Sequence, residues 1–207
     1  MQNGRIGASP RETRHDFDDE ATAQRYSEKL IAEKLKKGYV EGAIAAAPAH
    51  QQPVWAEMMM DEDVFWRIIK LFNWKKLGDD DAVLEPAIKA LSKMSIDDIK
   101  RFEDIMTEKL HALDTRAHAK AGMFDDFFSD DGFLYQRCVV VANGKQVFEE
   151  ILADPDQMPQ DSEFECLLYL AGSAYERKTG EEFDYSSPLS YESGHNEAGW
   201  EKEPQAQ

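Results

Sequence analysis

Two groups of residues have the types and spacing that chemistry requires. The first is an acidic cluster of four carboxylates, Asp125, Asp126, Asp130 and Asp131. Because carboxylate oxygens are preferred ligands of hard divalent cations, one hypothesis is a metal-dependent enzyme that uses this cluster. The cluster nevertheless lacks the alternating acidic positions of an ion-binding loop. Ser129 and the aspartates that follow it suit a helix start, where carboxylates are stabilised without a ligand, and we favour this capping role.

The second group is Glu108, His111, Asp114 and His118, whose spacings of three, three and four residues can place them on one helix face. A single Glu-x-x-His is half of a di-iron signature, which needs a second such motif on a facing helix. The motif recurs only at residues 192–195, in a segment with the composition of a tail. We therefore interpret the four residues as a solvated polar face.

Sequence motifs for other chemistries are missing. The chain contains no Gly-rich phosphate loop, nucleophile elbow or paired zinc motif. Cys138 and Cys166 lie in apolar helical surroundings, so we expect both to be reduced core residues. The sequence thus favours a function other than catalysis, with no catalytic residue, no metal and no cofactor.

Helical periodicity dominates the middle and the end of the sequence. Within residues 65–72, apolar side chains recur at i, i+3, i+4 and i+7, which places them on one helix face. Ser95 and Asp98 have capping-box spacing before a long apolar stripe, and Ser162 and Glu165 have the same spacing further on. Each pattern predicts a helix.

Residues 124–144 are compatible with a buried strand or with a helix, since the run Cys-Val-Val-Val favours the extended state. Asp130 and Asp131 suit a helix N-terminus and Gly144 suits its end, so we predict a helix. The expected fold class is mainly α. It combines a multi-helix domain with a small N-terminal α+β remnant of strand–helix–strand order.

Composition divides the chain into four parts. Residues 43–53 have no charge, no periodicity and two prolines, which is typical of a linker. We predict an N-terminal segment at 1–42, a linker at 43–56, a helical domain at 57–185 and a flexible acidic tail at 186–207.

The net charge of −17 is unevenly distributed along the chain. Residues 1–50 carry eight basic and eight acidic side chains, whereas residues 121–207 carry five and 19. Acidic surface repels phosphate, so any contact with nucleic acid should come from the N-terminal segment. No apolar run approaches the ~20 residues that span a bilayer, and we expect a cytoplasmic protein.

The N-terminal segment resembles a truncated WGR domain, a family with a Trp-Gly-Arg triplet on a strand and a helix closing on Lys-Lys-Gly-Tyr. Asn3 stands where the family has Trp, and only Met1 and Gln2 precede it where the family has its opening strands. We therefore expect that a complete WGR sheet does not form from this chain alone. The matching residues are Gly4, Arg5, Ile6, Gly7, Phe17, Ala21, Lys34, Lys36, Lys37, Gly38 and Tyr39.

This resemblance implies contact with nucleic acid. In the family the triplet's Arg and nearby basic residues meet the backbone, and the Trp packs against a terminal sugar or base. The corresponding residues here are Arg5, Lys34, Lys36 and Lys37. The alternative is that the lysines only complement the negative end of the helix dipole.

A second resemblance covers residues 60–185, which are similar to domain of unknown function 4240. It rests on Phe65-Trp66, the acidic run 129–133, Arg137, Asp154-Pro155 and the ending at 174–180. The family implies an all-helical bacterial domain and supplies no activity. Its signature residues, of unknown role, are Ser129, Asp130, Asp131, Phe133 and Arg137.

Together these features indicate a binding or regulatory protein whose partner is a nucleic acid or another protein, and not a membrane. Two alternatives stay open. One is the metal-dependent enzyme built on the acidic cluster. The other is an acidic protein that imitates phosphate charge and so occupies a nucleic-acid-binding partner.

Overall fold

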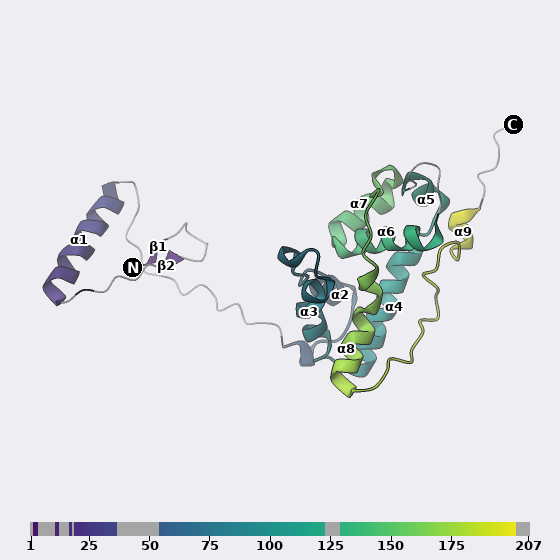
Figure 1. Cartoon of the computed structure of the whole chain (residues 1–207), viewed down its shortest axis with the longest axis horizontal. Helices are drawn as coiled ribbons and strands as arrows, with labels where there is room; N and C mark the ends of the chain where they lie inside the picture. The colour runs from purple at the N-terminus through teal and green to yellow at the C-terminus, as the bar shows by residue number, and fades with distance from the viewer. Residues whose placement is uncertain are drawn as a thin grey trace. The chain divides into compact units, whose positions relative to one another are not determined.

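The computed structural model describes residues 2–3, 11–12, 17, 19–36, 54–122 and 129–201 of the chain. It divides into two compact units, Met1–Pro53 and Val54–Gln207 (Figure 1). The four-part division with a linker at 43–56 stays a prediction.

The first unit contains a two-stranded antiparallel sheet and one helix. Asp19 begins the helix, because its carboxylate accepts a 2.8 Å hydrogen bond from the backbone N–H of Thr22. The ring of Phe17 lies 5.1 Å from that of Tyr26 one turn into the helix. The strand predicted after this helix falls outside the described residues. The elements are β1 (Gln2–Asn3), β2 (Arg11–Glu12) and α1 (Glu20–Lys36).

The described residues of the second unit contain helices joined by loops and no strand, so the prediction of a mainly α fold is confirmed. Its α-helices are α2 (Glu62–Ile69), α3 (Asp80–Leu91), α4 (Ile96–Ala112), α5 (Arg116–Gly122), α6 (Asp130–Ala142), α7 (Lys145–Ala153), α8 (Leu170–Thr179) and α9 (Glu197–Trp200). Short 3-10 helices are η1 (Trp55–Glu57), η2 (Trp74–Lys76), η3 (Pro155–Gln157) and η4 (Glu165–Tyr169).

Polar side chains at the helix starts explain why these segments fold locally. Ser95 and Asp98 form the predicted capping box at the start of α4, each side chain accepting from the other's backbone N–H. The Asp98 carboxylate also accepts a 2.7 Å hydrogen bond from Met60 N, just before α2. One side chain therefore caps α4 and ties it to a segment 38 residues earlier.

Two local predictions are wrong. Ser162 donates to the carbonyl of Gln160 and caps no helix, and the residues that follow form η4 before α8 begins. The second wrong prediction is that residues 108–118 lie on one helix. The helix that starts after Ser95 ends at Ala112, and α5 is a separate helix.

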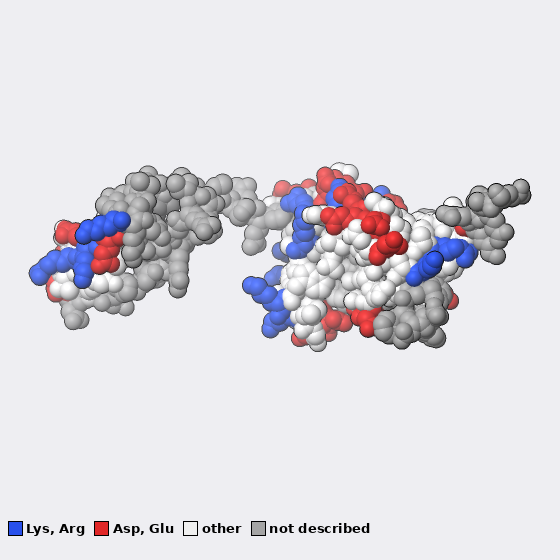
Figure 2. Space-filling view, turned by 90° about the horizontal axis from the view of Figure 1, so that it is seen from above, with Lys and Arg blue, Asp and Glu red and all other residues white. Residues whose placement is uncertain are grey.

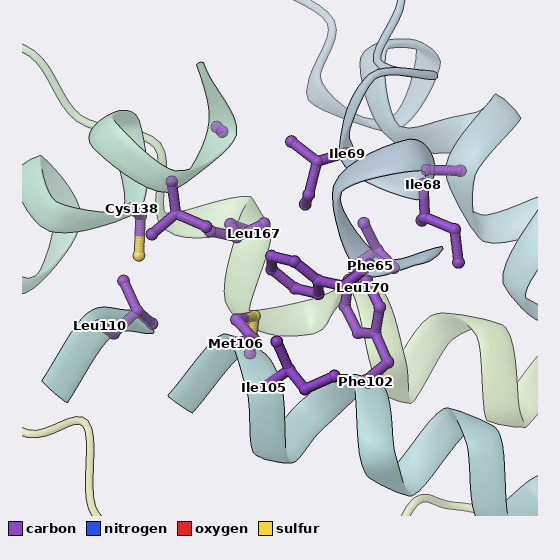
Figure 3. Close-up of a cluster of buried hydrophobic side chains, with 14 of the residues drawn as sticks. Phe65, Ile68, Ile69, Phe102, Ile105, Met106, Leu110, Cys138, Leu167 and Leu170 are labelled. Carbon is purple, nitrogen blue, oxygen red and sulfur yellow. The ribbon is translucent and has the colours of Figure 1, made fainter. Parts of the chain in front are cut away.

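The core gathers around α4, which supplies Phe102, Ile105 and Met106 to it (Figure 3). These side chains meet residues of α2 such as Phe65, whose ring centroid lies 4.9 Å from that of Phe102. Fully burying one such side chain contributes about 1.5–3 kcal/mol. The periodicity of α2 and α4 thus predicts the core faces correctly.

Both cysteines are free. Burial raises the pKa of the Cys138 thiol, and it raises that of Cys166 to about 12. Neither is a thiolate at neutral pH, which fits their predicted role as core residues. No helix among the described residues is long and apolar enough to cross a membrane.

Residues 183–201, called here the C-terminal segment, return from the end of α8 along α4 to α9 (Figure 1). The flexible tail from residue 186 stays a prediction, while the described residues 186–201 make hydrogen bonds to the rest of the second unit. Hydrogen bonds join this segment to Asp104 and His111 of α4 and to Asp114 just beyond it. Its polar composition hides the order, because backbone groups and the Tyr185 hydroxyl make these contacts with residues far away in the sequence.

Candidate functional site

The acidic signature lies at the start of α6. Ser129 is the N-cap, and its hydroxyl accepts a hydrogen bond from Gly132 N at 3.2 Å. Asp130 and Asp131 occupy the first turn with exposed side chains. There they face the positive end of the helix dipole. Asp125 and Asp126 lie outside the described residues.

In the described part of the chain, no group of three or more His, Cys, Asp or Glu side chains is placed to hold a metal ion. We expect millimolar Mg²⁺, Mn²⁺ or Ca²⁺ to leave Tm unchanged, because a specific site would raise it by binding the native state. Differential scanning calorimetry checks this. A saturable increase in Tm that disappears in the double variant Asp130→Ala, Asp131→Ala would instead support the metal-dependent enzyme.

Arg137 of α6 is fully buried and joins three parts of the second unit. Its Nη1 donates to the carbonyls of Leu110 and Tyr191, both at 2.9 Å, and Nη2 donates to Ser193 Oγ at 2.8 Å. The Ser193 hydroxyl in turn donates to the carbonyl of Asp130 at 2.7 Å. Arg137 therefore reaches the acidic signature through Ser193 and a backbone carbonyl.

Two opposing effects act on the pKa of Arg137. Desolvation lowers the pKa of its guanidinium, while the nearby carboxylates of Asp114 and Glu192 raise it. The charge also lies 4.7 Å above the ring of Phe133, another signature residue. Phe133 and Arg137 therefore act together to fix the C-terminal segment against α6.

Asp114 forms a second buried anchor, just beyond α4. Its Oδ1 accepts from Gly194 N at 3.0 Å and from Trp200 Nε1 at 2.9 Å, and its Oδ2 accepts from Asn196 N at 2.9 Å. Three donors satisfy this carboxylate, which is what burial of a charge requires. We name Asp114, Arg137 and Ser193 the Arg137 cluster.

The interpretation of Glu108, His111, Asp114 and His118 as a solvated polar face is wrong. Only Glu108 is exposed, and the four span two helices. His118 is buried, with Nε2 3.0 Å from the carbonyl of Ile151, and desolvation lowers its pKa. His111 Nδ1 lies 2.9 Å from the carbonyl of Ser190. Because α4 ends at Ala112, the four residues do not share one helix face. His111, Asp114 and His118 instead contact other segments of the second unit.

A cavity of about 610 Å³ opens between α4, α8 and the C-terminal segment. Its volume falls in the range of about 300–1,000 Å³ that is usual for small-molecule sites. Its floor includes Glu103 of α4, which is 8% exposed. The residues that line it are Glu103, Leu168, Tyr169, Gly172, Ser173, Glu176, Glu182, Phe183, Tyr185 and Tyr191, called here the Glu103 pocket.

Burial raises the pKa of the Glu103 carboxyl to about 7, and the neighbouring Asp104 carboxylate adds to the effect. The carboxyl has no hydrogen bond or ion pair with another described residue. Perturbed carboxyls in cavities are candidates for functional sites. No sequence pattern indicates this carboxyl, because Glu103 flanks an ordinary apolar stripe.

The candidate nucleic-acid-binding residues belong to the first unit. Lys34 and Lys36 lie in the last turn of α1, and Lys36 is exposed. Basic and acidic side chains both lie on the visible face of α1, and both signs also occur on the visible face of the second unit (Figure 2). Arg5 and Lys37 lie outside the described residues.

Comparisons with known proteins identify both parts of the chain. Residues 60–177 match the model of a family described as Protein of unknown function (DUF4240), and residues 1–45 match the WGR domain model. The two resemblances found in the sequence are confirmed. No curated protein and no solved structure matches the chain.

Proposed function

The chain belongs to the DUF4240 family and carries a WGR domain, and from this premise we propose that it is a nucleic-acid-associated binding or regulatory protein. The WGR match is the observation that carries the proposal. In this proposal nucleic acid contacts residues 1–45, and the helical domain supplies a separate binding surface. We propose that the protein acts in the cytoplasm of a bacterial cell.

The charge distribution supports this division of roles. Residues 1–50 have no net charge, so their cations face less repulsion from phosphate than those of the acidic second unit. Lys34 and Lys37 are three residues apart, and a helical continuation of α1 would align them on one face. With Arg5 and Lys36 they form the proposed contact set.

We expect weak binding, with a Kd in the high micromolar to millimolar range, because Asn3 replaces the family's Trp and the whole chain carries −17. Fluorescence anisotropy of a short labelled DNA duplex with free ends, at two salt concentrations, measures it. Arg5→Ala and the double variant Lys34→Ala, Lys37→Ala should each weaken binding and reduce its salt dependence, because fewer counterions are released.

Lys29→Ala is the matched control, since Lys29 is exposed on the same helix and is not part of the family's basic ending. Asn3→Trp should tighten binding by on the order of tenfold if the restored ring stacks on a terminal base. Equal losses for Lys29→Ala and for the double variant would contradict the proposed contact set. So would tight binding that is insensitive to Arg5→Ala.

The phosphate-mimicking role stays an alternative proposal, supported by the acidic surface of the second unit. In this role the chain would not bind the duplex in the anisotropy assay. It would instead release DNA from a basic binding partner.

A further inference from the structure

We propose that the Glu103 pocket is a binding site for a small aliphatic amine in its ammonium form, held by Glu103 and by the surrounding phenol rings. This inference concerns the helical domain and goes beyond the proposed contact with nucleic acid. The experiment that tests it is independent of residues 1–45.

The lining of the pocket selects for positive charge. Among its described lining residues are three carboxyls, from Glu103, Glu176 and Glu182, and no basic side chain. Glu176 and Glu182 are exposed, whereas Glu103 is buried. A cation in the pocket therefore meets two solvated carboxylates and a third that is largely removed from water, where electrostatic attraction is stronger.

Glu103 is the residue of the pocket that most clearly suits a cationic ligand. Buried polar groups in native proteins are normally hydrogen-bonded, and those that are not need an explanation. Glu103 is more than nine-tenths buried as a residue and lines the cavity, and no hydrogen bond joins its carboxyl to another described residue. An ammonium group would supply the donors that the carboxylate lacks.

Aromatic rings around the pocket suit the same ligand. Tyr169, Tyr185 and Tyr191 contribute to its walls, and the faces of such rings attract cations. One face of Tyr185 already meets a cation, since Lys100 Nζ lies 5.4 Å from its ring centroid. The Tyr185 hydroxyl donates to Asp104 at 2.9 Å, which holds the ring at the edge of the pocket. The aliphatic part of the ligand would pack on Leu168 and Phe183.

Binding should release a proton near neutral pH. With a pKa of about 7, the Glu103 carboxyl is largely protonated at pH 6, and an incoming ammonium ion favours the carboxylate, so the proton leaves to solvent. The charged and titratable groups facing Glu103 are Asp104 on α4, Tyr169 and Glu176 from η4 and α8, and Glu182, Tyr185 and Tyr191 from the connecting chain.

The test is isothermal titration of the full chain with 1,4-diaminobutane, with the uncharged analogue 1,4-butanediol in parallel. We expect saturable binding of the diamine only. Repeating the titration in buffers of different ionisation enthalpy should show proton release at pH 6 and almost none at pH 8.5. Affinity should rise with pH over the same interval.

Three variants connect the binding to the pocket. Glu103→Gln should weaken it by about tenfold or more, as expected when a charge-assisted hydrogen bond is lost, and should abolish the proton release. Ser173→Phe fills the cavity without changing any charge and should also prevent binding. Glu182→Gln at the rim should weaken binding more than Glu181→Gln, which removes the same charge from the neighbouring residue outside the lining.

No saturable binding of the diamine would overturn the proposal. Equal affinity for 1,4-butanediol would also do so, because it would show that charge is not recognised. Equal affinity in Glu103→Gln and the unchanged chain would place the amine elsewhere on the acidic surface.

Discussion

Replacing Arg137 with methionine is expected to lower the free energy of unfolding by about 3 kcal/mol, since it leaves buried acceptors unsatisfied. The substitution keeps an unbranched apolar side chain and removes the guanidinium. It deprives the carbonyls of Leu110 and Tyr191 of a donor, and it removes the donor to Ser193. Asp114 also loses a nearby positive charge.

Urea unfolding followed by circular dichroism measures this loss. Arg101→Ala is the control, because Arg101 makes a 2.9 Å ion pair with Glu108 at the surface, and such pairs contribute only about 0–1 kcal/mol. Limited proteolysis should also show earlier cleavage within residues 183–201 in Arg137→Met. Unchanged stability together with unchanged protection of that segment would show that Arg137 does not hold it in place.

The second large effect is a gain in stability from Glu103→Gln at alkaline pH. The Glu103 carboxyl has a pKa of about 7 in the folded protein against an ordinary value of 4.5. The folded state therefore binds this proton more tightly than the unfolded chain does. Its contribution to stability is fully present below pH 4.5, declines as the pH rises, and is lost above pH 7.

Glutamine resembles the protonated carboxyl and does not titrate. At pH 8 the Glu103→Gln variant should be more stable than the unchanged chain by about 3 kcal/mol, since each pKa unit corresponds to about 1.4 kcal/mol. At pH 5 the two should agree within about 1 kcal/mol. Urea titrations at the two pH values test this, with Glu182→Gln as an exposed control that should change stability little at either. Destabilisation of Glu103→Gln at pH 8 would contradict the account.

Such a gain would bear on function. The charged Glu103 carboxyl lowers the stability of the fold at physiological pH. Replacing it with glutamine would therefore raise stability without a cost, unless the charge has a function. The stability measurement and the amine titration therefore examine the same residue in two ways. The first tests its burial and the second tests its ligand.

Local sequence determines much of this fold. Ser95 with Asp98 and the apolar spacing within residues 65–72 predict helix starts and core faces that the structure contains. These signals succeed because a cap and an amphipathic face act over three to seven residues. The two family resemblances are likewise read from short motifs, and the family comparisons confirm them.

Tertiary structure alone decides the Arg137 cluster and the Glu103 pocket. Arg137 bonds to Ser193, 56 residues away, and Asp114 bonds to Asn196, 82 residues away. No local pattern encodes such pairs. The composition of the C-terminal segment is typical of a tail, because its order depends on backbone and side-chain contacts with residues far away in the sequence. Glu103 flanks the apolar stripe of α4, and it becomes a buried carboxyl with a raised pKa only when α8 and the C-terminal segment close over it and remove it from water.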